Sequence, residues 1–343
     1  MSGVQHIQIT EDEEGMRLDR WFREHFPQLG HGQLQKLMRK GQVRLDGSRV
    51  KANDRVETGQ SVRVPPLGEK PSNGKTTQRK ETTISDRDRK FMNDMVLHRD
   101  KNVIVLNKPS GLAVQGGSGT KVHIDGLLPA LVEVGAERPR LVHRLDKDTS
   151  GILVLAASVK AARALTASFR TSDARKLYWA LVAGAPRPGN GKIDLALSKA
   201  MTQTRSGGRE QMVAGGEDAK RAITYYETLD RAGQRFAWMA LYPQTGRTHQ
   251  LRVHMAEIGS PIIGDGKYGG EDAMPVESDA GSNALSSRLH LHARALSIPH
   301  PGGGQLNIIA PLRDHMRDSW KYLGFEENEY ANISTIDRWP EFT

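Results

Sequence analysis

The chain of 343 residues has 49 Lys or Arg against 40 Asp or Glu, a formal net charge of +9 that favours a polyanionic partner such as nucleic acid or a membrane surface. Because it has no cysteine, disulfides, thiolate metal sites and cysteine nucleophiles are excluded, and a reducing, cytoplasmic location fits. The longest apolar run, 152–157, is far shorter than the roughly 20 residues of a membrane span, and the N-terminal residues lack an apolar signal core. We therefore expect neither membrane insertion nor export.

Residues 1–66 are predicted to form a small basic module. Within it, residues 16–64 contain 11 Lys or Arg and five Asp or Glu, a net charge of +6. Apolar residues at helical spacing predict two short helices. Alternating apolar residues around the turn Asp46-Gly47, and again before Pro65-Pro66, then predict a small hairpin-rich sheet. The apolar residues of the two helices are Leu18, Trp21, Phe22 and Phe26, then Leu34, Leu37 and Met38.

Four cations of this module are candidates for contact with phosphates: Lys36, Arg39, Lys40 and Arg44. The first three lie together on the second predicted helix and at its C-terminal end, where positive charge also complements the helix dipole. A solvated surface carries the same kind of charge run, and charge alone does not separate the two interpretations.

The remaining chain divides by composition into three parts. Residues 67–92 are polar and predict a flexible linker. Residues 93–325 mix strand and helix patterns and predict the main domain, and 326–343 are expected to be a C-terminal tail. Within the main domain, 102–107 predicts a buried strand, 221–229 with 235–242 predicts an antiparallel hairpin, and 200–218 predicts a long mobile loop that could carry substrate contacts.

Common cofactor motifs are absent from the sequence. Neither the Gly-rich loop 115–120 nor 189–192 has the spacing of a P-loop, which argues against a nucleotide-driven enzyme. The 12 histidines include the pairs His249 with His254 and His290 with His292. Without accompanying acidic or cysteine ligands, these histidines fit hydrogen-bonding or packing roles better than a metal site. We therefore expect no metal and no cofactor.

Two segments carry more polar and charged residues than a core strand or a surface helix requires: LVHRLDKDTSGILVLAA at 141–157 and QTGRTHQLRVHMA at 244–256. An Asp surrounded by arginines stays ionised near neutral pH, because opposite charge offsets the cost of desolvation. Such a carboxylate suits nucleophilic or charge-stabilising chemistry. A buried structural ion pair has the same residue pattern, and spacing alone leaves both interpretations open.

These two segments resemble the signatures of the RluA-type pseudouridine synthases. Residues 143–151, HRLDKDTSG, are similar to the first signature, and residues 246–254, GRTHQLRVH, are similar to the second. Shorter matches at 106–111, 176–178, 291–293 and 300–301 occur in the expected order, so that the resemblance covers about 95–323. The N-terminal module resembles an S4 RNA-binding domain.

The resemblance implies an α+β fold with a mixed, largely antiparallel sheet, flanking helices and a small S4-like domain of two helices and a small sheet. It implies that Asp146 is the catalytic carboxylate that isomerises uridine to pseudouridine, and that Arg252 pairs with it. Arg144 is expected to hold the extruded nucleotide open, Tyr178 to stack on the flipped uracil, and Leu251 to pack beneath the site. The implied partner is large-subunit ribosomal RNA or an assembly intermediate, bound by a monomer.

Three alternatives remain at this stage. The enzyme could modify another structured RNA, such as tRNA. The chain could instead be a non-catalytic RNA-binding protein of ribosome assembly, although Asp146, Arg252 and Tyr178 are all retained. A metal-dependent nuclease would need acidic clusters that the sequence lacks.

Overall fold

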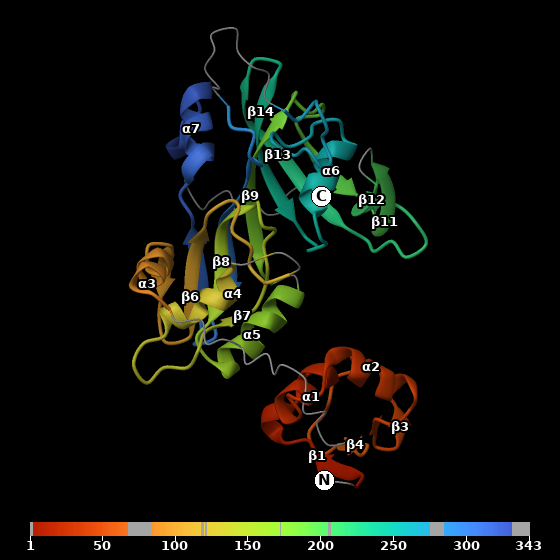
Figure 1. The fold of residues 1–343 in the computed structure, drawn as a ribbon. Helices are drawn as coiled ribbons and strands as arrows, with labels where there is room; N and C mark the ends of the chain where they lie inside the picture. Colours follow the sequence, from red (N-terminus) through yellow and green to blue (C-terminus); the bar gives the residue numbers. More distant parts are fainter. Residues whose placement is uncertain are drawn as a thin grey trace. The chain divides into compact units, whose positions relative to one another are not determined.

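The structure is a computed structural model that describes residues 3–67, 84–117, 120, 122–171, 173–204, 207–274 and 285–330, without the side chains of 12, 31 and 202–209. The chain divides into two compact units, Met1–Thr82 and Thr83–Thr343. Each unit has its own hydrophobic core. Figure 1 shows the helices and strands of both units.

The N-terminal unit packs two helices on a four-stranded sheet. Its helices are α1 (Leu18–His25) and α2 (His31–Arg39), preceded by the short helix η1 (Glu11–Glu13). The strand order is β1-β4-β2-β3, with β1 at Gln5–Gln8, β2 at Arg44–Leu45, β3 at Ser48–Arg49 and β4 at Ser61–Val64. The predicted order of two helices followed by a small sheet is confirmed, whereas β1 was not predicted.

The local sequence explains this unit. The apolar stripe of α1 buries Leu18, Trp21 and Phe22 against Val62 and Val64 of β4 in a single core. The predicted turn joins β2 to β3, and both of its residues, Asp46 and Gly47, have a positive φ, 47° and 80°. Aspartate and glycine tolerate this conformation better than other residues do, and two such residues in sequence form a tight hairpin turn.

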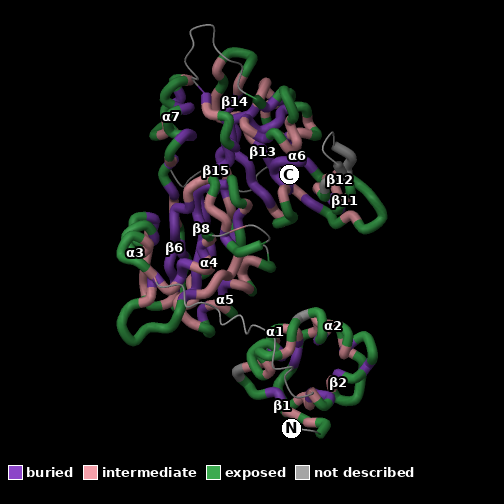
Figure 2. Tube along the Cα trace, viewed as in Figure 1, coloured by how far each residue is buried: buried purple, intermediate pink, exposed green. Residues whose placement is uncertain are grey.

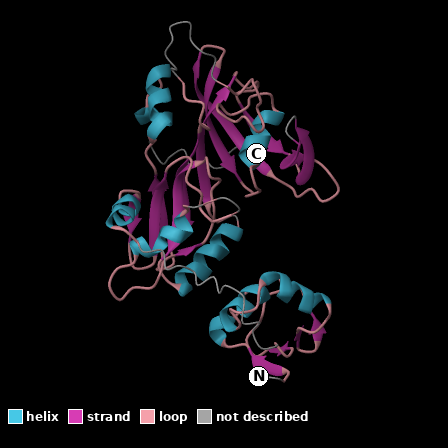
Figure 3. Ribbon diagram, viewed as in Figure 1, coloured by secondary structure: helices cyan, strands magenta, loops and turns pink. Residues whose placement is uncertain are grey.

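The larger unit is built on a ten-stranded mixed sheet (Figure 3). Its main path runs β10-β13-β14-β9-β15-β8-β6-β5; β16 pairs with β15, and β7 pairs with β8. Among the described strands of this sheet, β15 and β8 are the only parallel neighbours. The strands are β5 (Val96–Arg99), β6 (Val103–Lys108), β7 (Arg140–Leu141), β8 (Ser150–Ala156), β9 (Arg175–Ala183), β10 (Asn190–Asp194), β13 (Ile223–Ala232), β14 (Phe236–Pro243), β15 (Leu291–Pro299) and β16 (Gln305–Ile309). The predicted mixed, largely antiparallel sheet with flanking helices is confirmed.

Helices cover the sheet and bury its central strands (Figure 2). Near β6 and β8 the core includes α3 (Asp86–Asn93), α4 (Ile124–Leu127), η2 (Leu128–Leu131) and α5 (Val159–Arg170). At β9 and β14, α7 (Asp314–Leu323) joins one core and α6 (Gln250–Glu257) joins another. Side chains of β9 alternate between these two cores, as strand geometry requires. None of the described helices is both long enough and apolar enough to cross a bilayer.

Three sequence predictions need correction. Residues 86–92 of the predicted linker belong to α3, whose Met92 is buried in the core, while 68–83 lie outside the described residues. The predicted loop 200–218 is largely a hairpin of β11 (Leu197–Thr204) and β12 (Gly207–Ala214), because backbone pairing compensates for its polar composition. The predicted tail begins with the packed short helix η3 (Glu327–Tyr330), where Arg294 bonds Glu327; residues 331–343 lie outside the description.

The other predicted elements are present. The strand expected at 102–107 is β6, and the hairpin expected at 221–242 consists of β13 and β14.

Candidate active site

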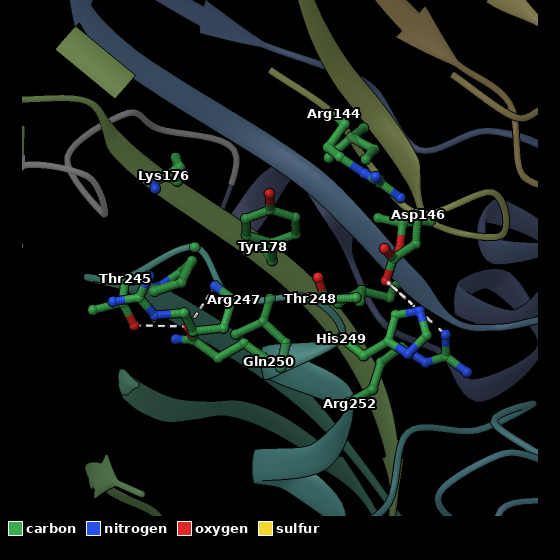
Figure 4. A pocket seen from close by; sticks show the side chains of 16 residues that line it. Arg144, Asp146, Lys176, Tyr178, Thr245, Arg247, Thr248, His249, Gln250 and Arg252 are labelled. Carbon is green, nitrogen blue, oxygen red and sulfur yellow. Dashed lines mark hydrogen bonds and ion pairs between the residues drawn. The ribbon is translucent and has the colours of Figure 1, made fainter. Parts of the chain in front are cut away.

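A cleft in the larger unit brings the two sequence signatures together (Figure 4). Its walls come from the loop between β7 and β8, from β9, and from the segment that joins β14 to α6. The lining residues are Arg144, Leu145, Asp146, Thr149, Lys176, Tyr178, Pro243, Thr245, Gly246, Arg247, Thr248, His249, Gln250, Leu251, Arg252 and Leu291. The cleft therefore contains all five site residues of this unit that were predicted from the sequence.

The loop that carries Asp146 is held by the turn after β6. The ammonium of Lys108, which is fully buried, donates to the carbonyls of Pro109, Leu112 and Lys147, each at 2.9 Å. The amide of Gly111 also donates to the carbonyl of Lys147, at 3.0 Å. Burial lowers the pKa of Lys108 to about 7, against the opposite effect of nearby aspartates. These bonds fix the backbone immediately after Asp146.

Gly151 permits the strand that follows this loop to reach its neighbour. Its φ is +103°, and a Cβ atom at this position would lie 2.3 Å from the carbonyl oxygen of Ala293 in β15. No side chain fits there. The glycine of the first signature is therefore explained by the close approach of β8 to β15, which sets the start of β8 beside the cleft.

Tyr178 presents its ring to the cleft from β9. Its neighbours Leu177 and Trp179 point to the opposite face of the sheet and into the core beneath α7. Figure 4 shows the ring between Asp146 on one side and Lys176 on the other. Burial and the nearby charge of Asp146 raise the pKa of the Tyr178 hydroxyl, so the phenol stays neutral at physiological pH.

The second signature surrounds Asp146 with nitrogen atoms. His249 precedes α6 with a left-handed φ of 53°, and its Nε2 lies 3.7 Å from Oδ2 of Asp146. One terminal nitrogen of Arg252 lies 4.0 Å from the same oxygen. The carboxylate of Asp146 is 21% exposed, so it reaches the cleft while it faces these two side chains.

Arg252 makes its closest ion pair with Asp265 rather than with Asp146. Its Nε and Nη2 each donate to one carboxylate oxygen of Asp265 at 2.7 Å, and the Asp265 side chain is only 1% exposed. Backbone amides of Lys267 and Tyr268 also donate to Asp265. Burial opposes the charge of Arg252, but its bonds to Asp265 raise its pKa. Arg252 is thus a fixed cation beside Asp146.

Other polar residues of the signatures serve the scaffold. His143 accepts a hydrogen bond from the amide of Val154 and stacks on Phe169, and burial lowers its pKa to about 3. Gln250 donates to the carbonyl of Ile223, and His254 is bonded to Thr224. These contacts tie each signature to its supporting strand. Within the described part of the chain, no group of three or more His, Cys, Asp or Glu is arranged to hold a metal ion.

Comparisons with known proteins agree with this arrangement. A model of the RNA pseudouridylate synthase family matches residues 102–257. Ribosomal large subunit pseudouridine synthase C of Escherichia coli O157:H7 is 36% identical, over 92% of this chain and 95% of its own. The chain belongs to the RluA-type RNA pseudouridine synthases. As a member of this family, it is an enzyme that converts uridine in RNA to pseudouridine.

Two further relatives of this synthase come from a plant and from human. RNA pseudouridine synthase 4, mitochondrial, of Arabidopsis thaliana is 35% identical, over 89% of this chain and 78% of its own. The solved structure of human RNA pseudouridylate synthase domain containing 4 is 33% identical, with a TM-score of 0.57, and covers 69% of this chain and 96% of that one. The fold of the larger unit is thus shared with a solved family member.

Sequence reasoning missed three residues of the synthase site: His249 in its role beside Asp146, Asp265 and Tyr268. For His249, a hydrogen-bonding or packing role was preferred to metal binding, but no contact with Asp146 was predicted. Asp265 and Tyr268 lie in the segment GDGKYGG at 264–270, whose glycines indicate a turn but give no sign that its side chains contact Arg252 and His249. The expected pairing of Arg252 with Asp146 accordingly becomes a longer contact beside a bidentate bond to Asp265.

The four predicted RNA-binding cations belong to the N-terminal unit. Lys36, Arg39 and Lys40 are exposed on α2 and at its end. Arg44 is half-buried and donates to the carbonyls of Gly41 and Gly47. Three of the four are therefore available to phosphates, whereas Arg44 also holds its own turn.

Proposed function

We propose that this synthase modifies uridines of large-subunit ribosomal RNA and that Asp146 is its catalytic carboxylate. The observation that carries the assignment is the position of Asp146: a partly exposed carboxylate in the cleft, 4.0 Å from Arg252 and 3.7 Å from His249, across from the Tyr178 ring. The guanidinium of Arg252 places a positive charge beside this carboxylate, an arrangement that suits both nucleophilic and charge-stabilising roles. The ribosomal substrate is supported by the identity of 36% to the enterobacterial relative.

The reaction needs no cofactor in this proposal. Asp146 acts at the ribose of the target uridine, where the bond between C1′ and N1 breaks and a bond between C1′ and C5 forms. One proton leaves C5 and one is taken up at N1, so the product is an isomer of the substrate and no electrons are exchanged with another molecule. The carboxylate is released at the end of the cycle.

The uridine must leave its helix before this chemistry, because C1′ and C5 cannot be reached inside stacked RNA. Tyr178 offers its ring as a stacking surface for the extruded uracil, and Leu251 packs beneath it. Arg144 is exposed at the rim of the cleft, where its guanidinium can hold the nucleotide in its flipped position.

The N-terminal unit is proposed to be an S4-like RNA-binding domain that holds the substrate through Lys36, Arg39 and Lys40. Support comes from the net charge of +6 in residues 16–64 and from the exposure of these cations. A monomer that acts in the cytoplasm on ribosomal RNA, away from membranes, completes the proposal, in keeping with a chain that has no cysteine.

Substitution of Asp146 tests the catalytic assignment. The substrate is large-subunit ribosomal RNA that carries 5-tritiated uridine, from which isomerisation releases tritium. Asp146→Asn keeps the shape of the side chain but removes its charge, so turnover should fall by more than about 100-fold while RNA binding survives. Asp148→Asn is the matched control, because Asp148 lies in the same loop but does not line the cleft. Residual turnover of Asp146→Asn close to that of the control would contradict the assignment.

A second measurement tests the choice of RNA. We expect tritium release from ribosomal RNA and not from tRNA under the same conditions. Pseudouridine mapping in cells with and without the gene should show positions in the large-subunit RNA that depend on it. If the pseudouridines that depend on the gene were found only in tRNA, tRNA would replace ribosomal RNA as the proposed substrate.

A further inference from the structure

The backbone of His249 is held in an unusual conformation next to Asp146. Its φ of 53° and ψ of 19° are left-handed, a region that is uncommon for residues other than glycine, although histidine enters it more readily than most. The conformation places the ring between two partners: Nε2 faces Asp146 at 3.7 Å, and Nδ1 lies 2.6 Å from the hydroxyl of Tyr268. The unusual conformation thus coincides with a definite orientation of the imidazole.

The contacts of Tyr268 determine which of its partners receives its proton. The amide of Met212 in β12 donates to the Tyr268 oxygen at 3.3 Å, so the hydroxyl oxygen already serves as an acceptor. The hydroxyl proton is then directed to His249, the acceptor 2.6 Å away. Burial raises the pKa of Tyr268, which keeps this proton on the phenol.

The tautomer of His249 follows from this bond. Burial lowers the pKa of His249, against the opposite effect of Asp146, so the ring is neutral near pH 7 and carries one proton. When Nδ1 accepts from Tyr268, that proton is on Nε2 and points at the carboxylate of Asp146. The other tautomer would direct a lone pair at the carboxylate and would leave the Tyr268 hydroxyl proton without this acceptor.

We propose that Tyr268 and His249 act as a positioning pair in which the tyrosine hydroxyl fixes the Nε2–H tautomer of the histidine and the histidine orients the carboxylate of Asp146 for attack. This inference rests on the proposed role of Asp146. Both residues act through Asp146 and are positioning residues rather than catalytic ones. The proposal requires the separation of 3.7 Å to shorten to a hydrogen bond when substrate occupies the cleft, as catalytic contacts commonly do.

Asp146 needs His249 as a hydrogen-bond donor because Arg252 donates its hydrogen bonds to Asp265. Two of the three guanidinium nitrogens of Arg252 donate to Asp265, and the third lies 4.0 Å from Asp146. Arg252 therefore supplies charge without fixing the carboxylate plane. A donor on His249 approaches the same oxygen, Oδ2, and so selects one orientation of the carboxylate, leaving Oδ1 for the substrate.

Two substitutions of His249 separate donation to Asp146 from simple packing. His249→Gln extends its amide nitrogen to about the position of Nε2 and preserves a donor, whereas His249→Asn is polar, tolerates the left-handed backbone better, and is too short to reach Asp146. With tritium release from ribosomal RNA, we expect kcat to fall by about 10- to 100-fold for Asn and by much less for Gln, with KM unchanged in both. Equal kcat values for the two variants would overturn the proposal.

Substitution of Tyr268 tests whether its hydroxyl fixes the tautomer of His249. Tyr268→Phe removes the hydroxyl but keeps the ring over which Arg252 lies, 5.0 Å from the centroid. We expect kcat to fall by about 3- to 10-fold with KM unchanged. The double variant Tyr268→Phe with His249→Gln should match His249→Gln alone, because an amide has no tautomer to fix. Tyr330→Phe, which removes a hydroxyl bonded to Leu229, is the control and should retain wild-type kinetics.

The outcomes also separate this inference from the proposed function. If Tyr268→Phe lowers kcat by the same factor in both backgrounds, or leaves kcat unchanged, the positioning pair is wrong although Asp146 remains the catalytic residue. If Asp146→Asn retains turnover, the proposed function itself fails.

Discussion

The two units of this synthase use charge in opposite ways. In the N-terminal unit the cations are exposed: Lys36, Arg39 and Lys40 face solvent, and the pair of Arg20 and Glu24 has both side chains more than half exposed. In the larger unit the key charges are buried and paired, as in the bond of Arg252 to Asp265 with exposures of 10% and 1%. Exposed charge adds little stability but can neutralise phosphates, whereas buried charge fixes geometry.

Under the proposed function, this difference gives RNA binding and isomerisation different physical environments. Binding of a polyanion needs cations that can lose their counterions, and this requires solvent. Isomerisation needs a carboxylate whose neighbours do not move, and this requires burial and bonds such as those of Lys108 to three carbonyls. The predictions below test whether the contrast extends to stability, catalysis and RNA affinity.

The largest expected effect is selective acid destabilisation of the larger unit. Burial lowers the pKa of four of its histidines, to about 3 for His143, His290 and His292 and to about 4 for His254. Below the ordinary value near 6.5 the unfolded chain binds protons that the folded unit does not bind, so stability falls with decreasing pH from 6.5 down towards 3. At pH 5 the loss is about 2 kcal/mol for each histidine.

Urea unfolding of the full chain near pH 7.5 and near pH 5, followed segment by segment by hydrogen exchange, checks this prediction. The N-terminal unit is the internal control, because the two of its histidines whose side chains are described, His6 and His25, are exposed. Its midpoint should shift much less than that of the larger unit. If the urea midpoints of both units shifted equally between the two pH values, buried histidines would not distinguish the larger unit from the N-terminal one.

The next largest effect concerns the buried ion pair. Arg252→Met leaves the carboxylate of Asp265 buried without its main partner, so the free energy of unfolding should fall by about 3–5 kcal/mol and turnover should be strongly impaired. Asp265→Asn should impair turnover through a misplaced Arg252 even though Asp146 is intact. Urea titration and tritium release measure the two effects.

The exposed pair of Arg20 and Glu24 provides the matched control for this experiment. Arg20→Met should leave both stability and turnover nearly unchanged, because solvent already screens this pair. A comparable loss of stability in Arg20→Met and Arg252→Met would mean that burial does not distinguish the two units.

The sequence predicted the residues of the cleft better than their pairing. The family resemblance located Asp146 and Arg252, each within a contiguous signature, and Tyr178 in the shorter match at 176–178. Asp265 was missed because its partner Arg252 lies 13 residues away and only the tertiary fold joins them. The hairpin of β11 and β12 was missed for a related reason: its polar composition suggested a loop, and cross-strand pairing decided otherwise.

A smaller effect is expected at Tyr178, whose role depends on its ring face. Tyr178→Phe retains the stacking surface and should keep substantial activity, whereas Tyr178→Ala should lose stacking of about 1–3 kcal/mol, seen as reduced kcat/KM. Urea unfolding of both variants shows whether the cavity left by alanine also weakens the fold. Equal and large losses in both variants would instead assign proton transfer to the hydroxyl.

The smallest effect should come from the exposed cations of the N-terminal unit, and it should appear in the salt dependence of binding. A triple substitution by Gln, at Lys36, Arg39 and Lys40, removes up to three phosphate contacts. Fewer counterions are then released when RNA binds. The plot of log affinity against log salt should become shallower by roughly 0.7–0.9 for each lost contact, while kcat at saturating RNA changes little. Arg44 is kept in this variant because its bonds to Gly41 and Gly47 hold the turn.

A variant with the same loss of charge in the larger unit shows whether position matters. Lys160, Arg317 and Lys321 are exposed on α5 and α7 and do not line the cleft, so their replacement by Gln changes net charge equally without touching the predicted RNA-binding surface. We expect this control to keep nearly the full salt slope, because counterion release counts only the phosphates that the protein contacts. If both triple variants bind ribosomal RNA with the same slope, the cations of α2 are an ordinary solvated surface, and exposure alone does not make the N-terminal unit the RNA-binding one.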